Sequence, residues 1–251
     1  MRIVVLADSM AMPRLEQGCM IYWDDTWPYL LEQSLRNRGI ESEVINCASR
    51  SRTADTLTGL DFLEHIIWKR PQAIILQVGI VDCTPRVFSK REKKLLNYPF
   101  VPARLRDWLV NYRSARRPRL VKRNPLGKVD TPPEKFRDFL AHFFSKVTAL
   151  ESDIQLIVLP VVANIPMMEM RSPGYGENVR LYNDILKSCS LAAKACWLDP
   201  GELFAEAEVR NHFCADGYHL NEAGTRRIAA AIGSLLMNRL VKAEIEVSDN
   251  E

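Results

Sequence analysis

Short apolar runs alternate with stretches of helical spacing along most of the chain. Five runs suit buried strands: 2–7, 42–47, 72–78, 154–159 and 196–198. Apolar residues at three- and four-residue spacing predict helices at 27–38, 54–69, 133–150, 177–194 and from Asn221 to about 240. Strands that alternate with helices in this way predict an α/β fold, a mostly parallel five-stranded sheet with helices on both faces.

The alternation breaks at about 83–132, where Arg, Lys and Pro are frequent and no clear period remains. With 251 residues, of which 47% are hydrophobic, the chain suits a single domain over 1–251 with a basic insertion. The small formal net charge of +3 gives no indication of how unevenly the charge is distributed along the chain. Residues 104–128 hold nine basic residues and one acid, Asp107, so this stretch carries +8 and the rest of the chain −5.

Polar side chains follow the predicted strands, and in parallel sheets ligands bind at the carboxyl ends of the strands. Asp8 and Ser9 follow the first strand, Asn46 to Ser51 the second, and Gly79 to Cys83 the third. Near the end of the chain comes Asp216-Gly217-Tyr218-His219. A serine, a histidine and an aspartate can therefore meet at one edge of the sheet, whereas Asp8 is expected to brace the turn beside Ser9.

These three residue types suit nucleophilic catalysis. A serine hydroxyl needs a base to take its proton, and histidine titrates near neutrality. The imidazole then needs an acceptor that fixes its tautomer, and Asp216, three residues before His219, can supply it. Of the other histidines, His65 and His142 fall in predicted helices, and His212 has no acid three residues before it.

Four blocks in this order, ADSM at 7–10, the polar turn at 46–53, GIVD at 79–82 and DGYH at 216–219, resemble the SGNH, or GDSL-like, hydrolases. The resemblance implies a flavodoxin-like three-layer fold and the hydrolysis of esters. It implies Ser9 as the nucleophile, His219 as the base and Asp216 as its orienting acid. The Ser9 backbone N–H is then one oxyanion donor.

The chain departs from the family pattern in three places. Ala7 and Ser51 stand where the family has glycine, and Val81 stands where an asparagine normally donates to the oxyanion. Loss of one such donor typically costs about 10²–10³ in rate. We expect the Ser51 backbone N–H to serve as a second donor. Asn46, Arg50 and Arg86 are near enough in sequence to replace the missing donor, and we favour Arg86 because it follows the same strand as Val81.

Asn46, Arg50 and Asp82 are the expected substrate-binding residues, with strand-end backbone capping as the simpler role for Asn46 and loop bracing for Asp82. No cofactor or metal is expected. Cys47, Cys83 and Cys214 could hold zinc with His212 or His219, but their spacing matches no known finger.

The expected location is the cytoplasm. The apolar runs are too short to span a bilayer, and the first residues lack the features of a secretion signal. The six cysteines show no CxxC pair, which predicts free thiols in a reducing compartment.

We therefore expect a serine esterase that acts through an acyl-enzyme. Its expected substrate is an O-acyl ester of a sugar or glycan, with O-acetyl as the leading candidate. Two alternatives stay open: an acyltransferase with the same triad, and a catalytically weak protein that binds an anionic glycan or partner through its basic insertion. Residues 104–128 suit a lid, or a contact with a partner or an acidic membrane surface. No nucleic-acid motif accompanies the charge, and no GxGxxG follows the first strand, which argues against a nucleotide-binding domain.

Overall fold

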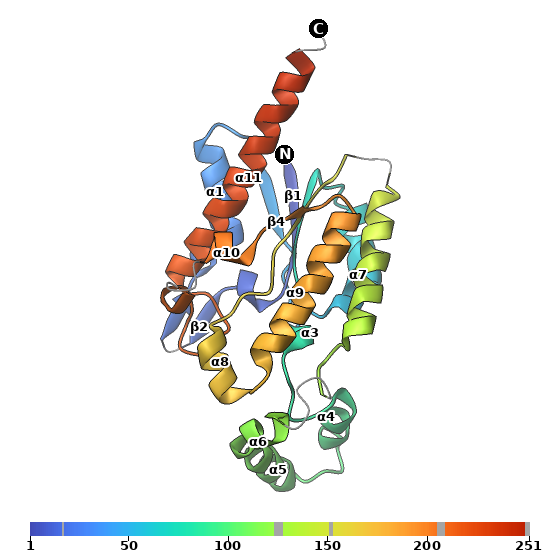
Figure 1. Ribbon diagram of the computed structural model, residues 1–251, viewed down its shortest axis with the longest axis vertical. Coiled ribbons are helices and arrows are strands. Elements are labelled where there is room, and N and C mark those ends of the chain that lie inside the picture. Colours follow the sequence, from blue (N-terminus) through green and yellow to red (C-terminus); the bar gives the residue numbers. More distant parts are fainter. Residues whose placement is uncertain (17, 123–127, 151–152, 205–208, 249–251) are drawn as a thin grey trace.

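The computed structural model describes residues 1–16, 18–122, 128–150, 153–204 and 209–248 (Figure 1). Five parallel strands form the central sheet in the order β4-β1-β5-β6-β7. They are β1 (Arg2–Ala7), β4 (Glu43–Asn46), β5 (Ala73–Gln77), β6 (Gln155–Val158) and β7 (Cys196–Trp197). Each predicted strand is confirmed to within one residue at either end.

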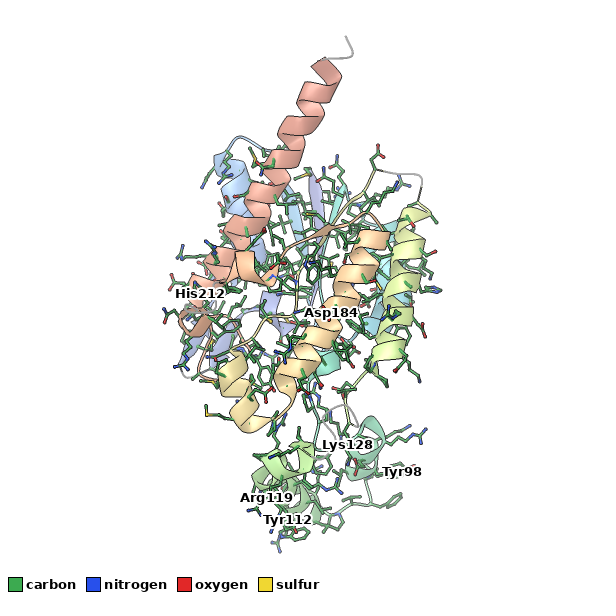
Figure 2. The ribbon with its side chains drawn as sticks, viewed as in Figure 1. Tyr98, Tyr112, Arg119, Lys128, Asp184 and His212 are labelled. Atoms are coloured by element: carbon green, nitrogen blue, oxygen red, sulfur yellow. A yellow bond between two sulfur atoms is a disulfide. The ribbon has the colours of Figure 1, made fainter. Side chains whose placement is uncertain are left out.

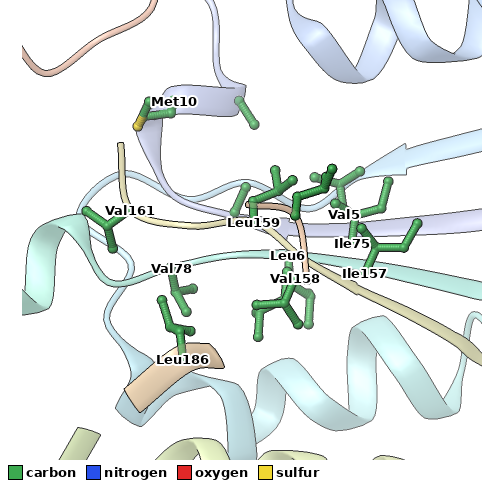
Figure 3. Packing of buried hydrophobic residues seen from close by; sticks show 14 of the residues in the cluster. Val5, Leu6, Met10, Ile75, Val78, Ile157, Val158, Leu159, Val161 and Leu186 are labelled. Carbon is green, nitrogen blue, oxygen red and sulfur yellow. The ribbon is translucent and has the colours of Figure 1, made fainter. Parts of the chain in front are cut away.

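Helices cover both faces of the sheet, so the expected three-layer α/β architecture is confirmed. On one side α1 (Trp27–Asn37) packs against α11 (Glu222–Ser248), and on the other α7 (Pro133–Thr148) packs against α9 (Tyr175–Ala192). β1 and β5 are buried almost throughout, because both of their faces are covered. Figure 3 shows the resulting core, in which Ile75 lies near its pairing partners Val5 and Ile157.

Shorter elements complete the body of the molecule. They are α2 (Leu60–Phe62), α3 (Ile80–Cys83), α8 (Ile165–Arg171), α10 (Pro200–Leu203), the 3₁₀ turns η1 (Ser9–Ala11), η2 (Trp23–Asp25), η3 (Ala54–Thr58) and η5 (Val209–His212), and the π-helical η4 (Leu63–Ile67). A separate antiparallel hairpin, β2 (Arg14–Glu16) and β3 (Cys19–Ile21), follows η1. This hairpin was not expected from the sequence.

The expected helix over 54–69 is wrong as a single element. It divides after η3 because Gly59 takes a non-helical backbone conformation, with φ −93° and ψ −131°, and the helical stretch that follows changes from α (α2) to π (η4). The last helix is capped as expected, since Asn221 Oδ1 accepts the Gly224 N–H at 3.0 Å, but it continues past residue 240.

The basic insertion carries three helices, α4 (Lys90–Leu96), α5 (Ala103–Ala115) and α6 (Arg117–Lys122), that lie together at one end of the molecule (Figure 1). We call residues 90–122 the basic lobe. The part of the predicted basic stretch at 123–127 lies outside the described residues. In the described part of the chain, no helix is long and apolar enough to cross a membrane.

Candidate active site

Ser9 lies at the carboxyl end of β1, as the first residue of η1. The turn begins here because the buried Asp8 carboxyl group accepts the Met10 N–H at 2.9 Å, which ends the strand ladder. Met10 and Ala11 are buried beneath the turn, whereas Ser9 is partly exposed. Asp8 therefore braces the turn, as expected, and presents Ser9 at the sheet edge.

A hydrogen-bonded relay joins Ser9 to the far end of the chain. Ser9 Oγ lies 2.9 Å from His219 Nε2, and His219 Nδ1 lies 2.5 Å from Asp216 Oδ2. The structure thus brings together the three residues that the sequence pattern selected. Their order, from hydroxyl to imidazole to carboxylate, is the one that a nucleophilic serine needs.

The loop that holds Asp216 and His219 owes its shape to Gly217, which has φ 77°, a left-handed conformation that favours glycine. The tight turn lets Asp216 Oδ1 accept the backbone N–H groups of Tyr218 and His219 at 2.9 and 3.0 Å. Burial alone would raise the pKa of Asp216, but the hydrogen bonds from the His219 ring and from these two N–H groups hold it below its usual range. Asp216 is therefore a carboxylate that orients the ring and does not compete for its proton.

Ser51 has the backbone that the family pattern requires of a glycine. Its φ is 58°, in the left-handed region, and it lines the same pocket as Ser9. In the described part of the chain, no acceptor takes a hydrogen bond from the Ser51 N–H. A serine thus adopts a conformation that favours glycine, beside the pocket that Ser9 lines.

Arg86 does not reach the pocket, which corrects its assignment as an oxyanion donor. Its guanidinium binds the Asp130 carboxylate, with Nη2 at 2.7 Å from Oδ2, and donates to the Val81 carbonyl at 3.1 Å. These partners hold the side chain at the base of the basic lobe. The space left by the asparagine that Val81 replaces is therefore not filled by Arg86.

Two of the three expected substrate-binding residues have structural roles instead. The Asn46 amide donates to the Ala11 carbonyl at 2.7 Å and accepts the Ala48 N–H at 3.0 Å. Asp82 is fully buried and accepts the Ala54 N–H at 3.1 Å, so it cannot touch a ligand. Arg50, the third, is exposed and lines the pocket beside Ser51.

Arg14 also contacts the base, His219, and the sequence analysis did not select it. From β2, its Nη2 donates to His219 Nε2, and its Nη1 lies 2.7 Å from the Glu16 carboxylate and 3.8 Å from Asp216. A strand of three residues is too short to show a period, so no sequence signal placed this hairpin at the site.

A disulfide joins Cys19 in β3 to Cys214, so the expectation of free thiols is wrong for these two residues. Cys47, Cys83, Cys189 and Cys196 are free. Cys214 is therefore not available as a zinc ligand, which removes the proposed cysteine set. Disulfides persist mainly in oxidising compartments, so the pairing does not support the argument from free thiols, and the cytoplasmic location stays a prediction.

The pocket over the relay has a volume of about 560 Å³. It is lined by Ser9, Met12, Pro13, Arg14, Leu15, Glu16, Arg50, Ser51 and His219. None of these lining residues belongs to the basic lobe, so the lobe does not cover the site as a lid in this structure. A larger hollow of about 830 Å³ lies at the amino ends of β1 and β4 and holds none of the relay residues.

Solved structures of ester hydrolases share this architecture. A lipase/acylhydrolase from Enterococcus faecalis matches with a TM-score of 0.64 and 16% identity, over 95% of this chain and 97% of that one. An acetyl xylan esterase, AlAXEase, matches with a TM-score of 0.60 and 15% identity, over 94% and 99%. A putative GDSL-like lipase from Parabacteroides merdae matches with a TM-score of 0.58 and 9% identity, over 91% and 92%.

No family model matches the chain, and no curated protein matches it either. At identities this low the likeness is one of fold, and it agrees with the resemblance found in the four sequence blocks. The chain therefore has the fold of the SGNH, or GDSL-like, hydrolases.

Proposed function

We propose that the protein is a serine esterase that cleaves an O-acyl ester through a covalent acyl-enzyme. The observation that carries this proposal is the relay in which His219 lies between the Ser9 hydroxyl and the Asp216 carboxylate. In that arrangement the imidazole can take the serine proton, and the carboxylate stabilises the imidazolium that forms.

The chemistry follows from the positions of these groups. Ser9 Oγ attacks the ester carbonyl as its proton passes to His219 Nε2, and the backbone N–H groups of Ser9 and Ser51 stabilise the oxyanion. The C–O bond to the alcohol then breaks, and His219 returns the proton to the leaving alcohol. Water, deprotonated by His219, attacks the acyl-enzyme and releases the acid and free Ser9.

We propose an O-acetyl group on a sugar or glycan as the substrate. The acetyl xylan esterase with the same fold acts on substrates of this kind, which supports the choice. Among the described residues that line the pocket, three are apolar, Met12, Pro13 and Leu15, which suits a short acyl group better than a long chain.

A fluorophosphonate probe tests the nucleophile directly. We expect the wild-type protein to be labelled and Ser9→Ala to lose both labelling and hydrolysis of acetylated oligosaccharides. Ser145→Ala, an exposed serine on α7, is the matched control and should behave as wild type. Labelling that persists in Ser9→Ala, or turnover that survives it, would contradict the proposal.

The two alternative functions, an acyltransferase and a weak binding protein, predict different experimental results. An acyltransferase would use the same relay but pass the acyl group to an acceptor alcohol, so adding a sugar acceptor would divert product from free acetate. The pocket opens to the surface, which favours attack by water. The absence of a side-chain donor at Val81 favours the second alternative, a catalytically weak binding protein. In that case the probe would not label the wild-type protein.

The basic lobe supports a second role, a contact with an anionic membrane surface. Its exposed side chains combine Arg and Lys with large aromatic groups, including Phe100, Trp108 and Tyr112. Aromatic rings favour the membrane interface, and basic groups favour anionic headgroups. This contact would bring the esterase to a surface without requiring a spanning helix.

A further inference from the structure

Two hydrogen-bond donors share one acceptor atom on the general base, Nε2 of His219. Ser9 Oγ lies 2.9 Å from His219 Nε2, and Arg14 Nη2 donates to the same nitrogen. A guanidinium stays protonated and cannot accept, so Nε2 must offer its single lone pair. Because the Ser9 proton must pass to that lone pair, Arg14 in this position competes with the nucleophile.

The charge of Arg14 acts in the same direction. General-base catalysis converts His219 into an imidazolium, and a guanidinium in contact with Nε2 repels that new charge. Full activity of the relay therefore requires Arg14 to move away from the ring.

The other partners of Arg14 can be exchanged. Its ion pair with Glu16 is 2.7 Å long, but the Glu16 side chain is 66% exposed, and exposed pairs contribute little stability. Asp216 is farther away, at 3.8 Å, and is already held by His219. An incoming carboxylate or phosphate could replace Glu16 and form a bidentate pair with the guanidinium.

Arg50 supplies a second cation at the same pocket. It is exposed, lines the pocket beside Ser51, and makes no side-chain hydrogen bond or ion pair with any residue that the structure describes. Among the described residues that line the pocket, Glu16 is the one acid against two arginines, so this lining carries a net positive charge. The two arginines come from different segments, Arg14 from strand β2 and Arg50 from the loop after β4, and both line one pocket.

We propose that Arg14 and Arg50 form an anion subsite, and that an oxyanion group on the substrate draws Arg14 away from His219. The inference rests on the proposed esterase function and names its substrate class, an acyl ester that also carries a carboxylate or phosphate. Binding of the correct substrate then frees the base, so specificity and activation arise from the same side chain.

Three aryl acetates test the subsite: 4-acetoxybenzoate, its neutral methyl ester, and 4-acetoxyphenyl phosphate. In Arg14→Ala we expect kcat/KM for the preferred anionic ester to fall about 10- to 100-fold, the value of one charge-assisted hydrogen bond. For the neutral ester we expect a rise, because Ser9 no longer shares Nε2. The larger loss identifies the source of the anion, carboxylate or phosphate.

Two further variants separate the contributions of Arg50 and Glu16 to anion binding from that of Arg14. Arg50→Ala should lower kcat/KM for the anionic ester without the rise on the neutral ester, because Arg50 does not touch His219. Glu16→Gln should lower KM for the anionic ester, since it removes the competing carboxylate. Arg180→Ala, an exposed arginine on α9, is the control for loss of one positive charge.

The outcomes are distinguishable. If Arg14→Ala lowers kcat/KM for all three esters by the same factor, Arg14 is a structural residue and the anion subsite is wrong. If the wild type shows no turnover of any ester that depends on Ser9, the proposed esterase function is wrong, and the inference that rests on it also fails. A thermal unfolding midpoint for each variant shows whether a loss reflects misfolding.

Discussion

Helices α7 and α5 have similar lengths, 16 and 13 residues, and opposite surroundings. Five residues of α7 are buried, Phe136, Leu140, Phe143, Phe144 and Val147, whereas none of α5 is. A core-facing apolar stripe stabilises the first helix. The second must depend on contacts of another kind, and the difference shows that the body and the basic lobe are stabilised by different forces.

Polar contacts hold the lobe. Glu92 accepts from Arg113 at 2.7 Å and pairs with Lys128 at 3.1 Å, and Arg117 attaches α6 to the body through Ser172 Oγ and the Pro85 carbonyl, at 2.7 and 2.9 Å. Figure 2 shows Tyr98, Tyr112 and Arg119 carried on this part of the chain, away from the sheet. Most large apolar side chains of the lobe are therefore exposed, and hydrogen bonds and ion pairs hold its shape.

The largest contrast should appear when an aromatic ring is truncated in each region. Phe143→Ala leaves a cavity where the ring packs against Phe62 and Phe144, and we expect it to lower the free energy of unfolding by about 3–5 kcal/mol. Phe100→Ala removes a ring that is 86% exposed and should change it by less than about 0.5 kcal/mol. Urea denaturation measures both. Equal losses would show that the lobe shares the core.

Asp8 in the body and Glu92 in the basic lobe should also respond to pH in opposite directions. Burial raises the pKa of Asp8 to about 7, so the fold holds a proton there that the unfolded chain releases near pH 4. Stability from this group is therefore greatest below pH 4 and is lost as the pH rises to 7, by on the order of 4 kcal/mol. Asp8→Asn should flatten that part of the stability curve.

Glu92 in the lobe behaves in the reverse sense. Hydrogen bonds from Arg113, together with those from Ser89 and Lys128, outweigh the desolvation and lower its pKa to about 2. Its contribution is present above pH 4.5 and is lost as the pH falls toward 2. Protease cleavage in the lobe of the wild type should therefore increase in acid, and a lobe that became more protected would contradict this assignment.

The smallest effect expected is on membrane contact. Replacing Arg104, Arg119 and Lys122 by Gln should weaken binding to vesicles of 30% phosphatidylserine in phosphatidylcholine by about 1 kcal/mol per charge at most. The matched control replaces Arg38, Lys135 and Arg180, three exposed basic residues of the body. If both triple variants lose the same affinity, net charge alone explains the binding. If the wild type ignores these vesicles, the membrane proposal is wrong.

The sequence pattern was most informative where a period or a strand end determines position. Each of the five strands lies where apolar runs predicted it, and Ser9, Asp216 and His219 meet because parallel strands end at one edge of the sheet. Asn46, Asp82 and Arg86 follow the same strands, but their side chains turn to backbone groups or to Asp130. Sequence spacing places a residue near an edge and does not tell which way its side chain points.

The other differences between the expected and the observed structure arise from features that no local sequence pattern indicates. The Cys19–Cys214 pair spans a separation of 195 residues, so neither cysteine indicates its partner. Arg14 reaches His219 from a hairpin too short to show alternation. The positive φ of Ser51 breaks the usual preference for glycine, so the family pattern located a conformation that the residue type alone argues against.

The Cys19–Cys214 disulfide would hold the two halves of the chain together after proteolytic cleavage in the basic lobe. A single proteolytic nick near Arg116, between α5 and α6, would separate a fragment with β4, β1 and β5 from one with β6 and β7. Ser9 would lie on the first piece and His219 on the second, yet Cys19 and Cys214 would keep them joined. Such a protein would run as one band without reductant and two with it, a split hydrolase whose halves are held together beside the relay itself.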